Sequence, residues 1–187
     1  MQFSFISLFM AVIFLAGCQS DRIRVYQAPK DVVTLNKRAN TDGPSLSWNV
    51  PKHWQYQQPK GMRISSYLVP GENNTFLDFS VVKLSGDGGG LRNNINRWRG
   101  QLGLDPVADV QQGRDYKILQ HVLGDVLWVR LENLRGQGML VGIFDAKGQI
   151  YFFKLNGALS QLNKESKTFE QVLRTMQDRK STRLNSS

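Results

Sequence analysis

The chain has 187 residues, with 24 Lys and Arg against 15 Asp and Glu, so its formal charge is +9. This length is typical of a single domain. A composition of 41% hydrophobic and 21% charged residues excludes a chain that is disordered throughout, a collagen and a coiled coil. One Cys and two His exclude an internal disulfide and a Cys-rich zinc site, and they leave little material for a His-based metal or catalytic site.

The N-terminal residues 1–17 are apolar and carry no charged side chain. An apolar run of about 13 residues is too short to span a bilayer and has the length of a signal-peptide core. The next residues, Leu15-Ala16-Gly17-Cys18, resemble the lipobox of bacterial lipoproteins. The resemblance implies a lipoprotein signal peptide over 1–17 and lipidation of Cys18. The alternative is a free Cys buried in a short apolar helix.

A lipid at Cys18 would make the membrane the first partner of the protein, because a multi-chain anchor holds almost permanently. Gln19 follows the Cys where some lipoproteins have Asp. By resemblance to the sorting of such proteins, Gln19 favours the cell envelope at the outer membrane, facing the periplasm, if the source is Gram-negative. We expect residues 18–44, which are mostly polar, to form the lipidated N-terminus and a tether.

The last residues, 179–187, lack apolar periodicity and predict a non-native or disordered tail. An ordinary polar tail is the alternative. Without Arg179, Lys180 and Arg183 the formal charge falls from +9 to +6, which weakens any argument for a nucleic-acid partner.

Residues 45–178 predict one domain. Alternation of apolar and polar residues, interrupted by Pro and Gly, predicts seven strands over 45–50, 62–68, 76–84, 117–122, 126–131, 139–144 and 150–155. Asp145–Gly148 reads as a hairpin turn between the last two. Helical periodicity predicts helices over 91–102 and 159–176, with Leu91, Ile95, Trp98 and Leu102 as the apolar stripe of the first.

The order of these elements is βββ-α-ββββ-α, with tight turns between most strands. Such an order favours an α+β fold in which an antiparallel sheet is flanked by helices.

The opening stretch Leu46–Trp54 is similar to the strand, Pro and Trp that begin domains of the Mog1/PsbP type, and the element order resembles that fold. The stretches Gly86–Gly89, Asn96–Arg99 and Gly100–Leu104 resemble an uncharacterised bacterial lipoprotein family with such a domain. The resemblance implies the fold and an envelope location. It carries no catalytic residues.

The Gly-rich loop over residues 85–90 precedes the first helix, where backbone N–H groups favour an anion. The loop lacks the ending of a P-loop and the spacing of a dinucleotide fingerprint. We therefore interpret it as a turn in which Asp87 caps the helix, and an anion site is the alternative.

The first helix carries a dense polar surface, which is our candidate for binding a partner or a small anion. Arginine forks hold carboxylates, and amide side chains pair with peptide groups. The surface comprises Arg92, Asn93, Asn96, Arg97, Arg99 and Gln101. The alternative is a solvated helix face that bonds to neighbouring loops.

No residues point to an enzyme. His53 and His121 stand in no ligand motif, no Gly-x-Ser-x-Gly elbow occurs, and no acid/base pair can be named. We therefore predict no catalytic residues, no metal and no cofactor. The aromatic residues fall mainly at core positions, so we expect no nucleic-acid partner.

The sequence predicts a lipid-anchored extracytoplasmic protein that acts as a binding or assembly module for a protein partner in the envelope. The alternative is a small-ligand-binding protein or hydrolase with a pocket between helix and sheet.

Overall fold

The structure is a computed structural model that describes residues 45–109 and 116–178. All of these residues fall within one unit of the chain, residues 39–187. The predicted signal peptide, Cys18, the tether and the tail lie outside the described residues.

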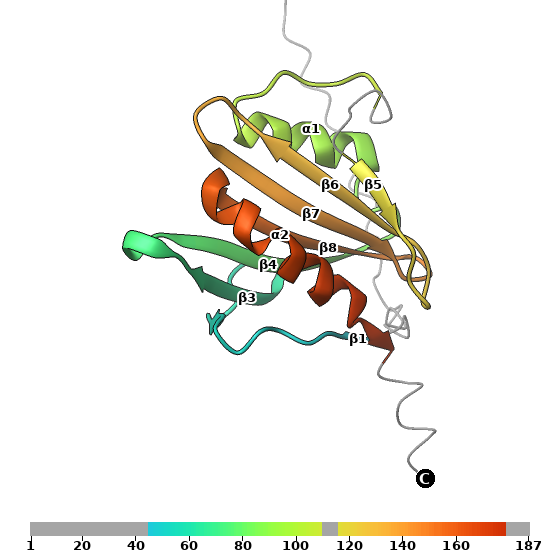
Figure 1. Ribbon diagram of the computed structural model, residues 1–187. Coiled ribbons are helices and arrows are strands. Elements are labelled where there is room, and N and C mark those ends of the chain that lie inside the picture. Colours follow the sequence, from blue (N-terminus) through green and yellow to red (C-terminus); the bar gives the residue numbers. More distant parts are fainter. Residues whose placement is uncertain (1–44, 110–115, 179–187) are drawn as a thin grey trace, which may run out of the picture. The chain divides into compact units, whose positions relative to one another are not determined.

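Seven strands form one antiparallel sheet in the order β2-β3-β4-β8-β7-β6-β5 (Figure 1). The strands are β2 (Gln55–Tyr56), β3 (Arg63–Pro70), β4 (Phe76–Ser85), β5 (Tyr116–Leu119), β6 (Val126–Glu132), β7 (Gln137–Asp145) and β8 (Gln149–Ala158). In this sheet, strands that follow one another in the chain are paired, except β4 and β5, between which the chain forms α1. The β4–β8 pairing joins the two halves of the sequence into one sheet.

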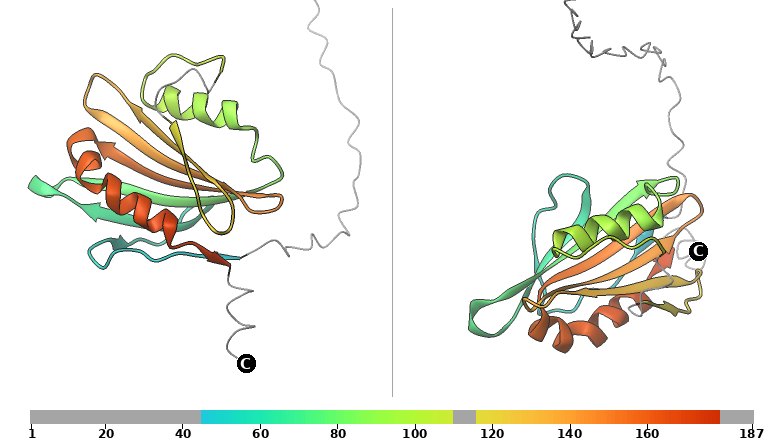
Figure 2. Two further views of the ribbon diagram at one scale, coloured as in Figure 1. Left: turned by 45° about the vertical axis from the view of Figure 1, so that its right-hand side comes forward. Right: turned by 90° about the horizontal axis from the view of Figure 1, so that it is seen from above.

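Two helices lie on opposite faces of this sheet, as the view from above in Figure 2 shows. They are α1 (Leu91–Gln101) and α2 (Leu159–Arg174). Because strand side chains alternate between faces, β6, β7 and β8 each contribute buried residues to two cores. The α2 core is built from Leu77, Phe79, Val81, Phe153, Leu155, Leu162, Phe169, Val172 and Leu173. The α1 core is built from Ile95, Trp98, Val129, Leu131, Met139, Val141, Ile143 and Phe152.

A second sheet, of two strands, joins the beginning and the end of the described chain. Strand β1 (Leu46–Ser47) pairs with β9 (Gln177–Asp178), and neither β2 nor β9 was predicted. The strand predicted over 45–50 is wrong beyond Ser47, because β9 offers only two residues to pair with. Trp48 instead packs its ring against Phe153, with ring centroids 5.0 Å apart.

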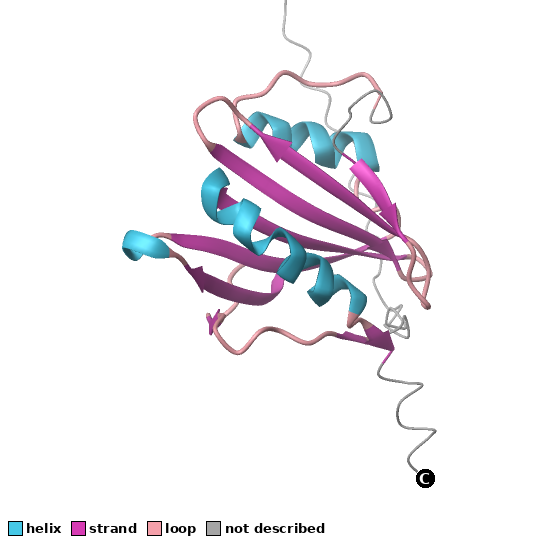
Figure 3. Ribbon diagram, viewed as in Figure 1, coloured by secondary structure: helices cyan, strands magenta, loops and turns pink. Residues whose placement is uncertain are grey.

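Two of the turns between strands have well-defined backbone conformations. A short 3₁₀ turn, η1 (Glu72–Asn74), links β3 and β4 (Figure 3). Between β7 and β8, Lys147 and Gly148 have φ of 50° and 87°. Two consecutive positive φ angles are those of a type I′ hairpin turn, so the turn predicted over 145–148 is confirmed.

The α+β fold class with an antiparallel sheet and two flanking helices is confirmed by this architecture. Of the helices in 45–109 and 116–178, neither is long and apolar enough to cross a membrane.

Candidate functional site

The face of the sheet that carries α1 is apolar under the helix and polar beside it. Ser66, Ser80 and Lys154 are direct register partners on the adjacent strands β3, β4 and β8. They lie on the same face as Phe152, which packs against α1. Ser66 and Ser80 are only 5% and 2% exposed, so this row is a polar strip built into the sheet.

A groove of about 270 Å³ lies between this row and α1. Its polar lining comprises Arg63, Ser80, Arg97, Gln101 and Lys154. Its apolar lining comprises Met62, Val82, Leu84, Trp98 and Phe152. We call it the cationic groove, because within the described parts of the chain no Asp or Glu lines it.

Arg63 reaches the groove from β3 and is held in place by two neighbours. Its Nη1 and Nη2 donate to Oδ1 and Oδ2 of Asp78 at 2.8 and 2.7 Å, and Nη1 also donates to Ser66 Oγ at 3.0 Å. The hydrogen bonds to Asp78 raise the pKa of Arg63 above its usual value. Both side chains are 32% exposed, so the pair is a partly screened surface bridge. Its main effect is to orient the guanidinium.

Lys154 projects from β8 into the same groove. Burial lowers the pKa of its ammonium group, repulsion from Arg63 and Arg97 lowers it further, and Asp78 acts in the opposite direction. Among the described residues, Nζ of Lys154 makes no hydrogen bond and no ion pair. The groove thus holds a partly desolvated charge that lacks a counter-charge of its own.

The structure divides the six residues of the predicted helix surface into three pairs. Asn96 donates to Val107 O at 3.0 Å and accepts from Val107 N at 2.8 Å, and Arg99 Nε donates to Asp105 O at 2.6 Å. These two side chains hold the chain that follows α1. Arg97 and Gln101 instead line the cationic groove.

The other two members of that surface lie at the beginning of α1. Asn93 donates to Gly89 O at 3.1 Å, while Arg92 is exposed on the first turn. Whether a partner contacts any of the six residues stays a prediction.

Side chains hold the Gly-rich loop through hydrogen bonds to its backbone. Asp87 accepts from Gly89 N at 2.9 Å, which closes the turn, whereas no side chain makes a capping hydrogen bond at the N-terminus of α1. The expectation that Asp87 caps the helix is therefore wrong, since its carboxylate is used inside the loop.

Asn94 is a residue that our reading of the sequence missed. It is 3% exposed and donates from Nδ2 to Gly88 O and Gly90 O at 2.8 and 2.9 Å. It also receives a hydrogen bond from Arg97. Its place four residues before the buried Trp98 put it on the inner face of the helix, which was the available signal.

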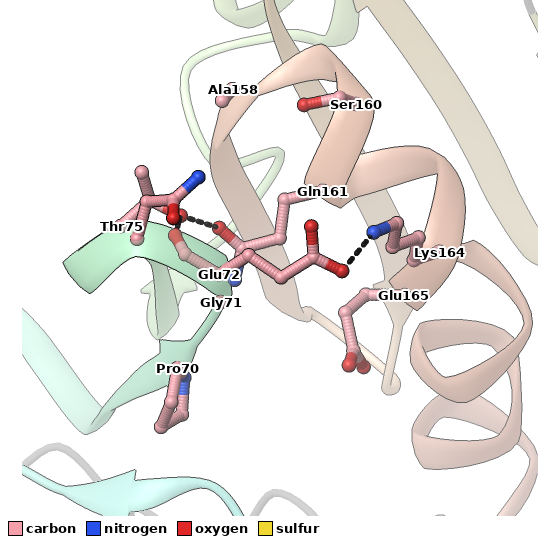
Figure 4. Close-up of a pocket in the computed structure, with 10 residues that line it drawn as sticks. Pro70, Gly71, Glu72, Thr75, Ala158, Ser160, Gln161, Lys164 and Glu165 are labelled. Carbon is pink, nitrogen blue, oxygen red and sulfur yellow. Dashed lines mark hydrogen bonds and ion pairs between the residues drawn. The ribbon is translucent and has the colours of Figure 1, made fainter.

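A second pocket, of about 330 Å³, lies where the β3–β4 turn meets α2 (Figure 4). Gln161 donates to Val69 O at 2.9 Å and accepts from Thr75 Oγ1 at 3.2 Å. Lys164 pairs with Glu72, and this hydrogen bond lowers the pKa of the exposed Glu72. These polar groups satisfy one another, so we interpret the pocket as the place where the hairpin is attached to α2.

The histidines take part in surface contacts. His53 Nε2 lies 3.3 Å from Glu165 Oε1, and His121 Nε2 lies 3.3 Å from Arg174 O. Within 45–109 and 116–178, no group of three His, Cys, Asp or Glu side chains is placed to hold a metal ion.

No family model matches the sequence, and no curated protein matches it. Among solved structures, the chain is similar to cyanobacterial PsbP (CyanoP) from Synechocystis sp. PCC 6803, with 12% identity and a TM-score of 0.46 over 73% of this chain and 92% of that one. It is also similar to LpqN of Mycobacterium tuberculosis, which is involved in cell envelope biogenesis, with 13% identity and a TM-score of 0.39 over 73% and 84%. PsbP is the fold type that the resemblance in the sequence implied.

Proposed function

We propose that this protein is a binding module of the cell envelope, held at the membrane by a lipid on Cys18, which binds an anionic group of a protein partner in the cationic groove. The observation that carries the proposal is the convergence of Arg63, Arg97 and Lys154 on one groove. The one acid among the charged groups that act on Lys154 is Asp78, which is already paired with Arg63.

Such an arrangement of cations destabilises the protein without a ligand and favours the binding of an anion. Like charges that lie close together repel, and burial weakens the hydration of Lys154. An anion in the groove would offset both effects, and the forked donors of an arginine suit a carboxylate or a phosphate. The polar strip beside α1 is therefore better explained by binding than by stability.

The groove is tested by titrating the protein with citrate and with inorganic phosphate, by calorimetry. We expect Lys154→Met to weaken binding at least tenfold, which corresponds to about 1.4 kcal/mol. Lys167→Met is the matched control, because Lys167 is exposed on α2 on the other face of the sheet. Equal affinities for the wild type and Lys154→Met would contradict the proposal.

The anchor is tested by growing cells with a clickable fatty-acid analogue. We expect label on the wild-type protein and none on Cys18→Ala, with the wild type in the membrane fraction and Cys18→Ala released from it. Gln19 adds the expectation of outer-membrane fractions if the source is Gram-negative. An unlabelled wild-type protein would remove the anchor from the proposal.

A small anionic ligand is the second candidate occupant, because the groove does lie between a helix and the sheet, as the alternative from the sequence required. We do not extend this to a hydrolase. A nucleophile needs a base within hydrogen-bond reach, and in the described part of the chain Ser80 and Lys154 share a register position without such a bond.

A further inference from the structure

A second groove adjoins the cationic groove at the C-terminal end of α1. It has a volume of about 520 Å³, and Gln101 lines both grooves. Along β8, Lys154 lines the first groove and Asn156 lines the second, two residues further along the same face. The two hollows therefore follow one another along the strand, and we call them together the α1 trough.

The length of the trough matches a short piece of extended chain. From Phe152, at one end, to Gly157, at the other, β8 advances about 16 Å at roughly 3.3 Å per residue. An extended peptide covers about 3.3–3.6 Å per residue. The trough is thus long enough for about five residues, whereas a single carboxylate or phosphate would occupy only one part of it.

The charge of the trough has one sign along its whole length. Arg135, in the β6–β7 turn, lines the second groove and adds to Arg63, Arg97 and Lys154 in the first. In 45–109 and 116–178 no Asp or Glu lines either groove. Charge complementarity consequently favours an acidic occupant.

The trough also presents amide groups between its charges. Gln101 and Asn156 line it, and Asn156 Oδ1 is buried without a hydrogen-bond partner among the described residues. Asn133 Nδ2 donates to Leu102 O at 2.8 Å, and its Oδ1 accepts from Arg135 N at 3.0 Å. Asn133 therefore supports the turn that carries Arg135. Gln101, Gln137 and Asn156 are lining amides that can pair with a peptide backbone.

We propose that the α1 trough binds an extended acidic segment of about five residues from the partner protein. One carboxylate is held by Arg63, Arg97 and Lys154, and a second is held by Arg135. Gln101 and Asn156 contact the peptide groups between them. This inference rests on the proposed function, since it names the part of the partner that the cationic groove binds.

The test compares two blocked probes by calorimetry: acetyl-pentaglutamate amide and acetyl-glutamate amide. We expect the pentapeptide to bind at least tenfold more tightly than the single residue. Arg135→Ala should remove at least fivefold of the pentapeptide affinity and leave the affinity for acetyl-glutamate amide unchanged, whereas Lys154→Met should weaken both. Lys167→Ala is the matched control, because this exposed cation of α2 lines neither groove.

The outcomes separate this inference from the function on which it rests. If the pentapeptide binds no more tightly than acetyl-glutamate amide while Lys154→Met still weakens both, the extended segment is overturned and the anion-binding groove stands. If Lys154→Met changes the affinity for neither probe, both proposals are overturned. If vesicles of pure phosphatidylglycerol bind through Lys154 and Arg135 more tightly than the pentapeptide does, the occupant is a lipid surface and the segment is overturned. Because Arg135 is exposed, Arg135→Ala keeps the test valid even if Lys154→Met does not fold.

Discussion

The ammonium group of Lys154 is partly buried, and the charges of Arg63 and Arg97 act on it. The pKa of its ammonium group is lowered from 10.5 by burial first and by Arg63 and Arg97 next. In the unfolded chain the same group titrates at its usual pKa of 10.5. Between the lowered pKa and 10.5 the unfolded state therefore binds more protons than the folded state does. In that pH window the penalty that Lys154 imposes on folding is relieved as the pH rises.

The same titration predicts how binding depends on pH. We expect the affinity of the wild-type protein for citrate to fall as the pH rises through the lowered pKa of Lys154, because a neutral amine no longer attracts the anion. In Lys154→Arg the guanidinium stays charged, so its affinity should remain constant over the same window. Calorimetric titrations across alkaline pH measure both curves, and superimposable curves would show that Lys154 does not contribute its charge to binding.

Only some residues of the candidate site could be predicted from the sequence. Arg97 and Gln101 could be recognised because they lie on one helix, where spacing alone places them together. Arg63 and Lys154 could not, since each is one polar residue in an alternating strand, and such a pattern ordinarily marks a solvent-facing side. Here that side is partly covered by α1.

At the scale of elements, the close approach of α2 to β7 depends on a missing side chain. A Cβ placed on Gly142 would lie 2.5 Å from Leu173 Cδ2 and 2.8 Å from Cδ1. We expect Gly142→Val to lower the free energy of unfolding by about 1–3 kcal/mol, because the larger side chain must push Leu173 out of the core. Urea denaturation measures the change.

Gly100 supplies the control for that substitution. It lies in α1, and a Cβ added there would have no atom within 4 Å. Gly100→Ala should therefore raise the stability by about 0.5–1 kcal/mol through helix propensity. Equal effects of the two substitutions would mean that the contact between α2 and β7 does not require a glycine.

The elements with strong periodicity were predicted from the sequence, and the short ones were not. Residues 159–176 placed Leu162, Phe169, Val172 and Leu173 on one side, and the structure buries them all. Two-residue strands such as β2 and β9 contain no full period, and they exist only because another strand is already in place beside them.

At the scale of the whole domain, the segment before β2 joins the N-terminal part of the described chain to the core of the sheet. Trp54 is 4% exposed, and its ring lies 4.8 Å from that of Phe79. We expect Trp54→Ala to lower the free energy of unfolding by about 3–5 kcal/mol, because a large side chain leaves a cavity over the central strands.

The conservative variant Trp54→Phe separates ring packing from hydrogen bonding. Trp54 Nε1 is buried and has no partner among the described residues, so losing this N–H group should cost nothing. Trp54→Phe is therefore expected to be much milder than Trp54→Ala in the same urea denaturation series. A cost below about 1 kcal/mol for Trp54→Ala would place this segment outside the cooperative core.

The sequence by itself determined the fold class, the long strands and both helices, because these follow from periods of two and 3.6 residues that act within a few positions of the chain. It also marked Cys18 as the predicted site of lipidation through a contiguous motif. Only the tertiary structure decided that β4 pairs with β8, and this pairing brings Arg63, Arg97 and Lys154 together beside α1. The pairing of strands far apart in the chain depends on how all the apolar faces are buried at once, and no local pattern in the sequence records that outcome.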